Sequence, residues 1–562
     1  MIRTKIVSSL EKAFIDEKID KFESLERMSV LKGERFSFQL LYTYEPDENS
    51  FERGKYIPKI SGELAKYAKL HNVRYIPVTN PVRPGRYDTN YLRTTPGLYP
   101  DLLTPLDEDV TVYIKPDALD SLWVEIELPK GLELSGDTVL KIELDSRLYY
   151  PEDVEDHHEE SIVIEVIDAT LPEETIAVTN WFYTDCLANE YNVPVWSEEH
   201  WRIIENFART AVKNGTNMLL TPVFTPPLDT YIGGERLTTQ LVGIKKTGNR
   251  YSYSWKLLDR WIDMCDRVGV KYLEISHFFT QWGAAHAPKV MATVDGEYKQ
   301  IFGWDTDAHG EEYKKFLRSF VKAFLTHMKK RGDDGRCFFH ISDEPSPSQI
   351  EDYKKSKKIV EKLLKNYVIM DALSNFEFYK KGAVKTPIPS NDHITPFLEA
   401  GVENLWTYYC CSQCKDVSNR FIAMPSWRTR SLGMQMYKYN ISGFACWGYN
   451  FYNSQHSRAS INPYLDQSGE RWVPAGDTFV VYPARDGTAL ESLRLLVFYD
   501  ALEDLAAMRL CESYYSHGEV VEAIEEILGE ELTFKRCALS SREMIKIREK
   551  INNMIKAAIK NV

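Results

Sequence analysis

Long apolar runs are missing from this sequence. No stretch of about 18 consecutive apolar residues occurs, the shortest length from which a bilayer-spanning helix is built, so we expect no association with a membrane. Positive charge is also in deficit, because 69 Lys and Arg stand against 82 Asp and Glu and give a net charge of −13. This balance opposes a surface for binding polyanions, and nucleic acid is not an expected partner.

Cysteine is sparse and odd in number, with 9 residues scattered between Cys186 and Cys537. This usage favours reduced thiols over a disulfide framework. The N-terminus, Met1-Ile-Arg-Thr-Lys-Ile-Val, places charges after two residues and lacks the apolar core of a secretory signal. We therefore expect a cytoplasmic protein.

Tryptophan is nearly absent from the first part of the chain, where Trp123 is the only one of 12 to precede residue 170. The same part carries short runs that alternate apolar and polar side chains, at residues 35–44, 110–114, 121–128, 138–144 and 161–167. Alternation with a period of two is typical of half-buried strands. The pattern predicts an N-terminal β-sandwich domain over residues 1–172.

Strand-like apolar runs alternate with amphipathic helical stretches from about residue 175, the pattern of βα units around a parallel sheet. Seven strands are expected at residues 176–179, 217–224, 272–279, 337–342, 368–373, 404–410 and 441–449, with an eighth near 386–397. The predicted fold class is α/β, with a (β/α)8 TIM-type barrel over residues 173–515. An open doubly wound sheet is the alternative, and no Gly-rich nucleotide-binding turn supports it.

The remaining residues, 516–562, are charged and helical in pattern, and we expect them to form a C-terminal helical appendage. Two long connections interrupt the barrel, Asp229 to Arg250 and Ala284 to Gly310. Loops of this length in a barrel are usually functional. They either wall the pocket and select a short, exo-acting substrate, or form a subunit interface, so a homo-oligomer is left open.

The segment His340-Ile-Ser-Asp-Glu-Pro follows a predicted strand, which places Asp343 and Glu344 at the C-terminal mouth of the barrel, where barrel active sites are built. Adjacent residues have Cα atoms about 3.8 Å apart, too close for the roughly 6.5–9.5 Å between the carboxyl groups of an inverting glycosidase. One solution is substrate assistance, in which the sugar's 2-acetamido oxygen is the nucleophile. One carboxylate then stabilises that group, and its neighbour protonates the leaving oxygen. Repulsion between the two charges would keep the acid protonated near neutral pH.

Further motifs accompany this segment: Trp447-Gly-Tyr-Asn-Phe-Tyr, Asn462-Pro-Tyr, Pro474-Ala-Gly-Asp-Thr-Phe-Val-Val-Tyr-Pro and Ser492-Leu-Arg. Together they make residues 175–515 resemble the domain of unknown function 4091 family, which is allied with glycoside hydrolase family 123. Members of family 123 are β-N-acetylgalactosaminidases with a β-sandwich followed by a (β/α)8 barrel, and they use an Asp-Glu pair in substrate-assisted catalysis.

The resemblance implies that Asp343 stabilises an oxazolinium intermediate and that Glu344 is the general acid and base. It does not carry over the sugar specificity, because many relatives of this domain have no established substrate. The acetamido sugar is therefore an expectation that rests on family membership.

Aromatic and polar side chains near the predicted strand ends are candidates for holding a sugar, which offers an apolar face for stacking and hydroxyl groups at its rim. Gln281 and His286 also follow the third predicted strand, and His340 is equally suited to orienting Asp343. The predicted substrate-binding residues are His277, Trp282, His340, Asp371, Trp406, Tyr408, Trp447, Tyr449 and Asn450.

A Cys-x-x-Cys pair joins Cys411 and Cys414, directly after Cys410. A structural zinc site needs four ligands, and no second matching pair lies nearby, so we expect neither a metal nor an organic cofactor. The position of these thiols beside Tyr408 and Tyr409 favours lining of the pocket.

These patterns and the resemblance favour an exo-acting glycoside hydrolase that removes a terminal β-linked 2-acetamido sugar, first N-acetylgalactosamine, with retention of configuration. Carbohydrate is the expected partner. Two alternatives are kept: a glycosidase of different sugar specificity, and a carbohydrate-binding protein without catalysis. The intact pair of Asp343 and Glu344 argues against the second.

Overall fold

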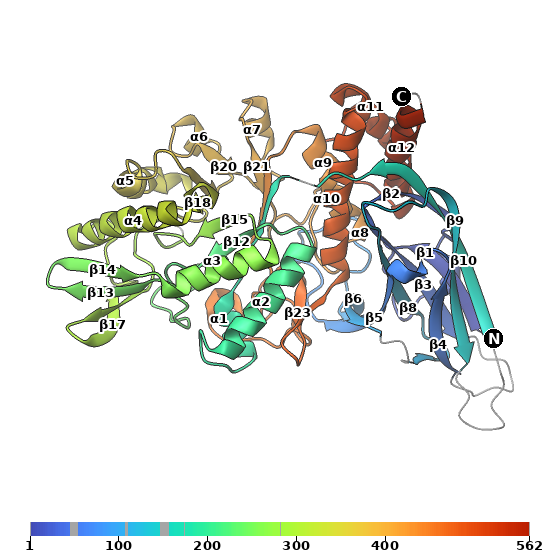
Figure 1. The fold of residues 1–562 in the computed structure, drawn as a ribbon, viewed down its shortest axis with the longest axis horizontal. Helices are drawn as coiled ribbons and strands as arrows, with labels where there is room; N and C mark the ends of the chain where they lie inside the picture. The colour runs from blue at the N-terminus through green and yellow to red at the C-terminus, as the bar shows by residue number, and fades with distance from the viewer. Residues whose placement is uncertain are drawn as a thin grey trace.

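The computed structural model describes residues 2–44, 54–106, 111–146, 157–173, 175–281 and 283–560. Figure 1 shows a strand-rich region in blue to teal beside a larger α/β region in green to orange. Within the described residues, no helix is both long enough and apolar enough to cross a membrane.

The N-terminal region contains two five-stranded sheets. The first is antiparallel, with the order β1 (Ile2–Ser8), β3 (Arg35–Tyr44), β8 (Asp120–Glu127), β5 (Ala68–Val78), β6 (Gly97–Pro105). The second pairs β10 with β2 in parallel and its other strands antiparallel, in the order β2 (Arg27–Lys32), β10 (His157–Thr170), β9 (Gly136–Ser146), β4 (Gly54–Ser61), β7 (Val112–Ile114).

One buried apolar cluster draws side chains from both of these sheets. Phe38 and Val124 come from the first sheet and Ile142 and Ile164 from the second, and all four are almost fully buried. Along β9 buried and exposed residues alternate, as the period of two predicts. The strand-rich character of the region is confirmed, while the sandwich and its boundary at residue 172 stay predictions.

The α/β region is built on eight parallel strands that follow one another around the sheet in chain order. β22 pairs with β11, and a bridge between Ser390 and Tyr408 joins the end of β20 to β21, so the barrel is nearly closed. The strands are β11 (Ala177–Asn180), β12 (Met218–Thr221), β15 (Tyr272–Ile275), β18 (Cys337–Phe339), β19 (Val368–Ala372), β20 (Thr386–Ile388), β21 (Trp406–Tyr408) and β22 (Gly443–Cys446).

Helices follow most of the barrel strands and begin or end at recognisable local signals. Ser197 caps α2 by accepting from the His200 N–H, and α3 and α4 end at Gly269 and Gly332, whose φ angles are +92° and +83°. The helices are α1 (Thr184–Glu190), α2 (Glu198–Lys213), α3 (Lys256–Val268), α4 (Glu311–Arg331), α5 (Ile350–Val360), α6 (Glu377–Lys380), α7 (Thr395–Glu399), α8 (Ser426–Arg430), α9 (Leu432–Lys438), α10 (Leu493–Glu512), α11 (His517–Leu528) and α12 (Ser541–Lys560).

The two long connections form a sheet of their own, because β13 pairs in parallel with β16 and each has an antiparallel partner. The insertions after β12 and β15 therefore support each other. Their strands are β13 (Gly243–Thr247), β14 (Arg250–Ser254), β16 (Val290–Val294) and β17 (Glu297–Phe302); the short hairpin of β23 (Val481–Pro483) and β24 (Ala489–Glu491) precedes α10.

The C-terminal helices join the two regions. α12 packs against β2 and β10 as well as α10. On α12, Arg548 donates to Glu34 at 2.7 Å and to Asp504 at 2.9 Å, and a second buried pair, Arg494 with Asp101 at 2.7 Å, ties α10 to β6. The segment after residue 515 is helical as predicted, and it packs across both regions; its domain boundary stays a prediction.

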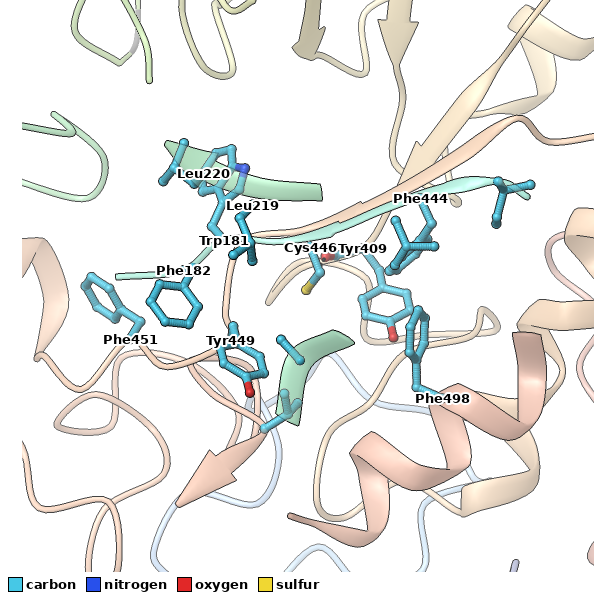
Figure 2. Close-up of a cluster of buried hydrophobic side chains, with 14 of the residues drawn as sticks. Trp181, Phe182, Leu219, Leu220, Tyr409, Phe444, Cys446, Tyr449, Phe451 and Phe498 are labelled. Carbon is cyan, nitrogen blue, oxygen red and sulfur yellow. Dashed lines mark hydrogen bonds between the residues drawn. The ribbon is translucent and has the colours of Figure 1, made fainter. Parts of the chain in front are cut away.

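The barrel sheet is packed on both faces, as a central parallel sheet requires. On the outside, Figure 2 shows Phe182 stacked on Tyr449 and Phe444 next to Phe498 of α10, with ring centroids 5.7 Å and 5.2 Å apart. On the inside, a separate buried cluster fills the base of the barrel; it contains Ala177, Met218, Met370, Ile388 and Trp406.

All eight predicted barrel strands are present, and most are shorter than the apolar runs that predicted them. The run 441–449, for example, contains β22 only over Gly443–Cys446. Its last residues leave the sheet and form the mouth of the barrel. The α/β class with a parallel barrel is therefore confirmed in this form.

Candidate active site

A pocket opens at the carboxyl ends of the barrel strands, the end at which barrel enzymes place their active sites. Every barrel strand except β20 contributes to it through its last residues or the loop that follows. The lining residues are Trp181, Tyr183, Leu228, Asp229, Gln281, Asp343, Glu344, Ala372, Tyr408, Cys410, Cys411, Ala445, Cys446, Trp447 and Trp472.

Asp343 is the buried carboxyl group of this pocket, with 5% of the residue exposed. Its Oδ2 accepts a hydrogen bond from Gln281 Nε2 at 2.7 Å. Burial, followed by the negative charge of Glu344, raises the pKa of Asp343 to about 8.

Glu344 is the exposed carboxyl group beside it. Tyr408 Oη donates to Glu344 Oε1 at 2.6 Å, and the Glu344 N–H donates to the Ala372 carbonyl of β19 at 3.1 Å. The φ of Glu344 is +41°, a left-handed conformation that is costly for a side chain with a Cβ and for a residue before proline. Strain of this kind persists only where the surroundings hold it, and here it separates a buried Asp343 from an exposed Glu344.

Gln281 has a fixed orientation because both ends of its amide are engaged. Its Oε1 accepts from the backbone N–H of Asp229, while its Nε2 donates to Asp343. Since a backbone N–H only donates, the amide must turn its NH2 group toward Asp343. The loops after β12, β15 and β18 are thereby linked at the carboxylate.

A layer of buried polar side chains lies beneath the carboxylates. Thr179, Glu274 and His340 stand two residues beyond Ala177, Tyr272 and Phe338 of the apolar base, and side chains two apart on a strand share a face. His340 Nε2 is 2.7 Å from Glu274, and its Nδ1 is 3.2 Å from Asp371.

The His340 imidazole is held in its cationic form by this layer. Burial lowers the pKa of His340, but the hydrogen bonds to Asp371 and Glu274 outweigh burial and raise the pKa to about 10. Both acids have further donors: Trp181 Nε1 reaches Glu274 at 2.8 Å, and Tyr353 and the Ile341 N–H reach Asp371. His340, Glu274 and Asp371 form a satisfied ion network, which also fixes the Trp181 ring in the pocket wall.

His277 stacks on His340, with ring centroids 4.3 Å apart and an interplanar angle of 18°. Neither of its ring nitrogens has a hydrogen-bond partner within the described part of the chain, and burial keeps its pKa well below the usual value. Donor atoms of His277, His340 and Asp371 lie within 4.8 Å of one another. An imidazole binds a metal ion in its own ring plane, and two stacked rings share no such point, so these residues do not fit a common metal ion.

Tryptophan side chains form the walls of the pocket. Trp447 Nε1 donates to Asp477 at 2.9 Å, which fixes the indole, and burial raises the pKa of Asp477 to about 7. The Trp447 and Trp472 rings meet edge to face at 5.6 Å. With Trp181 they provide apolar surfaces of the kind on which a pyranose ring stacks.

Of the predicted site residues, the structure brings Asp343, Glu344, Tyr408 and Trp447 together in the pocket. Trp282 lies outside the described residues. The remaining predicted residues are not among the lining residues, and their positions correct the sequence analysis; they are His277, His340, Asp371, Trp406, Tyr449 and Asn450.

Each of these corrections has a local cause. His277, His340 and Asp371 belong to the buried layer, and Trp406 fills the base of the barrel. Tyr449 turns outward and donates to the Phe207 carbonyl at 2.8 Å. The Asn450 amide pairs with the backbone N–H and carbonyl of Tyr183 at 2.8 and 3.1 Å, so it supports a pocket residue from behind.

The sequence analysis missed Trp181, Tyr183, Asp229 and Trp472. Trp181 directly follows β11, so the strand-end rule that selected Trp447 would have found it. Trp472 comes from the long loop after β22, and only the fold brings it next to Trp447. The sequence analysis named Gln281 at the end of the third predicted strand but did not include it among the predicted substrate-binding residues.

The cysteine cluster does reach the pocket. Cys410 and Cys411 line it, together with Cys446, while Cys414 is buried and donates its thiol to the Cys411 carbonyl at 3.0 Å. All 9 cysteines are free thiols.

Comparison with known proteins decides the family. A family model described as the glycoside hydrolase 123 catalytic domain matches residues 181–511, more than half of the chain. This chain belongs to glycoside hydrolase family 123. The matched range contains every residue that lines the pocket, and the protein is accordingly a glycoside hydrolase.

The family 123 fold is also found among solved structures. A family 123 glycoside hydrolase from Clostridium perfringens, described for glycolipid glycan hydrolysis, matches 100% of this chain and 98% of its own, with a TM-score of 0.73 and 14% identity. At this identity the likeness concerns the fold alone. A comparison with curated proteins found no match to the chain.

Two β-glucuronidases resemble the chain much less, and no conclusion is drawn from them. A β-glucuronidase from Bifidobacterium dentium covers 90% of this chain and 66% of its own, at 8% identity and a TM-score of 0.32. β-Glucuronidase 3 from Bacteroides uniformis covers 89% and 51%, at 10% identity and a TM-score of 0.26.

Proposed function

We propose that this glycoside hydrolase is an exo-acting, retaining enzyme that releases a terminal β-linked 2-acetamido sugar by substrate-assisted catalysis. The observation that carries the proposal is the pair of adjacent carboxyl groups at one strand end, one buried and one exposed, in a single pocket. Two groups on neighbouring residues act from one side of the sugar, where they can serve the acetamido group and the leaving oxygen.

In this proposal Asp343 receives the acetamido N–H, and its carboxylate stabilises the positive charge that develops on the oxazolinium ring. The Gln281 NH2 group favours the ionised form of Asp343 and holds it in place. In the reactive complex the proton stands on Glu344, which gives it to the leaving oxygen and later takes one from the attacking water.

Tyr408 supports the same assignment, because its hydroxyl donates to Glu344 Oε1 and leaves Oε2 for the leaving group. The three tryptophans stack on the sugar, with N-acetylgalactosamine as the first candidate. Binding by apolar faces and one amide contact explains specificity for an acetamido sugar without a metal or an organic cofactor.

The test is release of nitrophenol from α- and β-linked aryl glycosides, with and without the 2-acetamido group, by wild type, Asp343→Asn and the exposed-surface control Glu399→Gln. We expect hydrolysis of β-acetamido sugars only, lost in Asp343→Asn and kept in the control. A thiazoline that mimics the oxazoline should inhibit competitively.

Hydrolysis of plain glycosides, or insensitivity to the thiazoline, would move the assignment to a glycosidase of another specificity. If the wild type hydrolyses none of the aryl glycosides, the glycan of a glycolipid is the next substrate to test, in view of the Clostridium perfringens neighbour. Absence of hydrolysis of that glycan as well would favour a carbohydrate-binding protein without catalysis.

A further inference from the structure

A groove of about 680 Å³ between α4 and α5 is lined by cations, and it lies apart from the catalytic pocket. Lys314, Arg318 and Lys322 stand four residues apart on α4 and form one stripe along the helix. Each step of four residues advances about 6 Å along a helix, so the charges follow the groove.

The facing helix supplies a second stripe. Lys355, Lys358 and Lys362 come from α5 and the turn after it, at spacings of three and four residues that again share one face. Arg318 Nε donates to the Ile359 carbonyl at 3.3 Å, which holds the two helices together across the groove.

Four of these six cations pair with no acid in the described part of the chain; one of the four, Arg318, donates to the Ile359 carbonyl instead. Lys314 pairs with Glu311 at 2.9 Å and Lys355 with Asp352 at 3.0 Å. Within the described ranges no carboxylate pairs with the exposed side chains of Lys322, Lys358 and Lys362, and no acid lines the groove. The positive charge is concentrated in this groove although the whole chain carries a net charge of −13.

We propose that this groove binds an anionic polysaccharide, that is, a chain carrying sulfate or carboxylate groups, as a second carbohydrate site. Lysine is a flexible point charge that suits anionic groups spaced along a thin strand. The proposal extends beyond the catalytic function and does not depend on which sugar the pocket hydrolyses.

Two other polyanions fit the groove less well. Single-stranded nucleic acid is held by stacking on aromatic rings, and the groove lining contains no Phe, Tyr or Trp. An anionic membrane is bound by a surface that also inserts apolar side chains. Among the described residues, the exposed large hydrophobic side chains all lie outside α4 and α5.

The test uses a fluorescein-labelled heparin decasaccharide and fluorescence anisotropy at 50 to 200 mM salt. Wild type should bind it with an affinity that falls steeply as salt rises, and Lys322→Glu/Lys358→Glu/Lys362→Glu should weaken binding about 100-fold at low salt. The matched control Lys18→Glu/Lys69→Glu/Lys535→Glu changes the net charge equally at exposed sites elsewhere and should bind within threefold of wild type.

A desulfated decasaccharide, a single-stranded oligonucleotide and vesicles with 30% phosphatidylserine serve as comparisons. Absence of heparin binding by wild type, equal loss in both triple variants, or stronger binding of the oligonucleotide or vesicles would overturn the proposal. Hydrolysis of aryl glycosides and the unfolding midpoint should be the same in all three proteins, so that failure of the proposed catalytic function is scored separately. A Lys→Gln version of the groove variant should show an intermediate loss.

Discussion

Two sets of charged side chains lie one above the other in the barrel mouth, and they differ in how completely they are satisfied. In the lower set His340 sits between Glu274 and Asp371, and each acid has further donors. In the upper set, Asp343 and Glu344 each receive one side-chain hydrogen bond and face the pocket. A saturated network stabilises and positions, whereas acceptors left free in a pocket are available to a substrate.

The largest expected effect on activity comes from removing the exposed acid, Glu344, of the upper pair. Glu344→Gln should lower kcat on glycosides with poor leaving groups by about 10²- to 10⁴-fold, because in the proposed mechanism Glu344 protonates the leaving oxygen. Aryl glycosides with good leaving groups should retain much more activity. The measurement is kcat across a series of phenols of graded acidity, and equal loss throughout would contradict the role of Glu344 as the acid.

Breaking the lower network should affect stability first. His340→Leu leaves Glu274 and Asp371 buried without their cation, which should lower the free energy of unfolding by about 3–5 kcal/mol. Urea denaturation followed by tryptophan fluorescence measures the change. A loss below about 1 kcal/mol would mean that the lower layer is not the rigid support inferred from its hydrogen bonds.

A smaller effect should follow from Tyr408→Phe, which removes the hydrogen bond to Glu344. A bond to a charged group contributes roughly 1.5–3 kcal/mol, so kcat should fall about 10- to 100-fold. Tyr409→Phe is the matched control, because the neighbouring Tyr409 hydroxyl is buried without a partner among the described residues. The comparison fails if both variants lose activity equally.

The smallest effect is a shift of the pH profile. Asp343 loses its proton as pH rises through its raised pKa, about 8, and the proposed reaction needs one proton on the two carboxyl groups, so kcat/KM should decline above that pH. The Gln281 hydrogen bond lowers this pKa, and Gln281→Leu should therefore move the alkaline limb to higher pH. A profile of kcat/KM from pH 5 to 10 tests this, and an unchanged or lowered limb would contradict it.

Much of the fold was predictable because the hydrophobic pattern of each strand and helix lies within a short segment of the sequence. The apolar runs located seven of the eight strands, and the eighth was expected near residues 386–397 in order to complete the barrel. The strand-end position of Asp343 and Glu344 placed both in the pocket. The same rule failed for Tyr449 and Asn450, since it does not say to which side a residue turns after leaving the sheet. It also failed for His340 and Asp371, which lie one layer below the pocket.

The sequence by itself determined the class of the fold and the two carboxyl groups, because hydrophobic period and strand ends are properties of short segments. Only the tertiary structure decided which of the two carboxyl groups is buried, that Gln281 and Tyr408 hold them, and that Trp472 completes the pocket wall. The tertiary structure also decided the cationic groove, where positively charged residues from two helices lie side by side although the net charge of the chain is negative. The physical reason is that burial, hydrogen-bond partners and local charge arise from contacts between segments far apart in the chain.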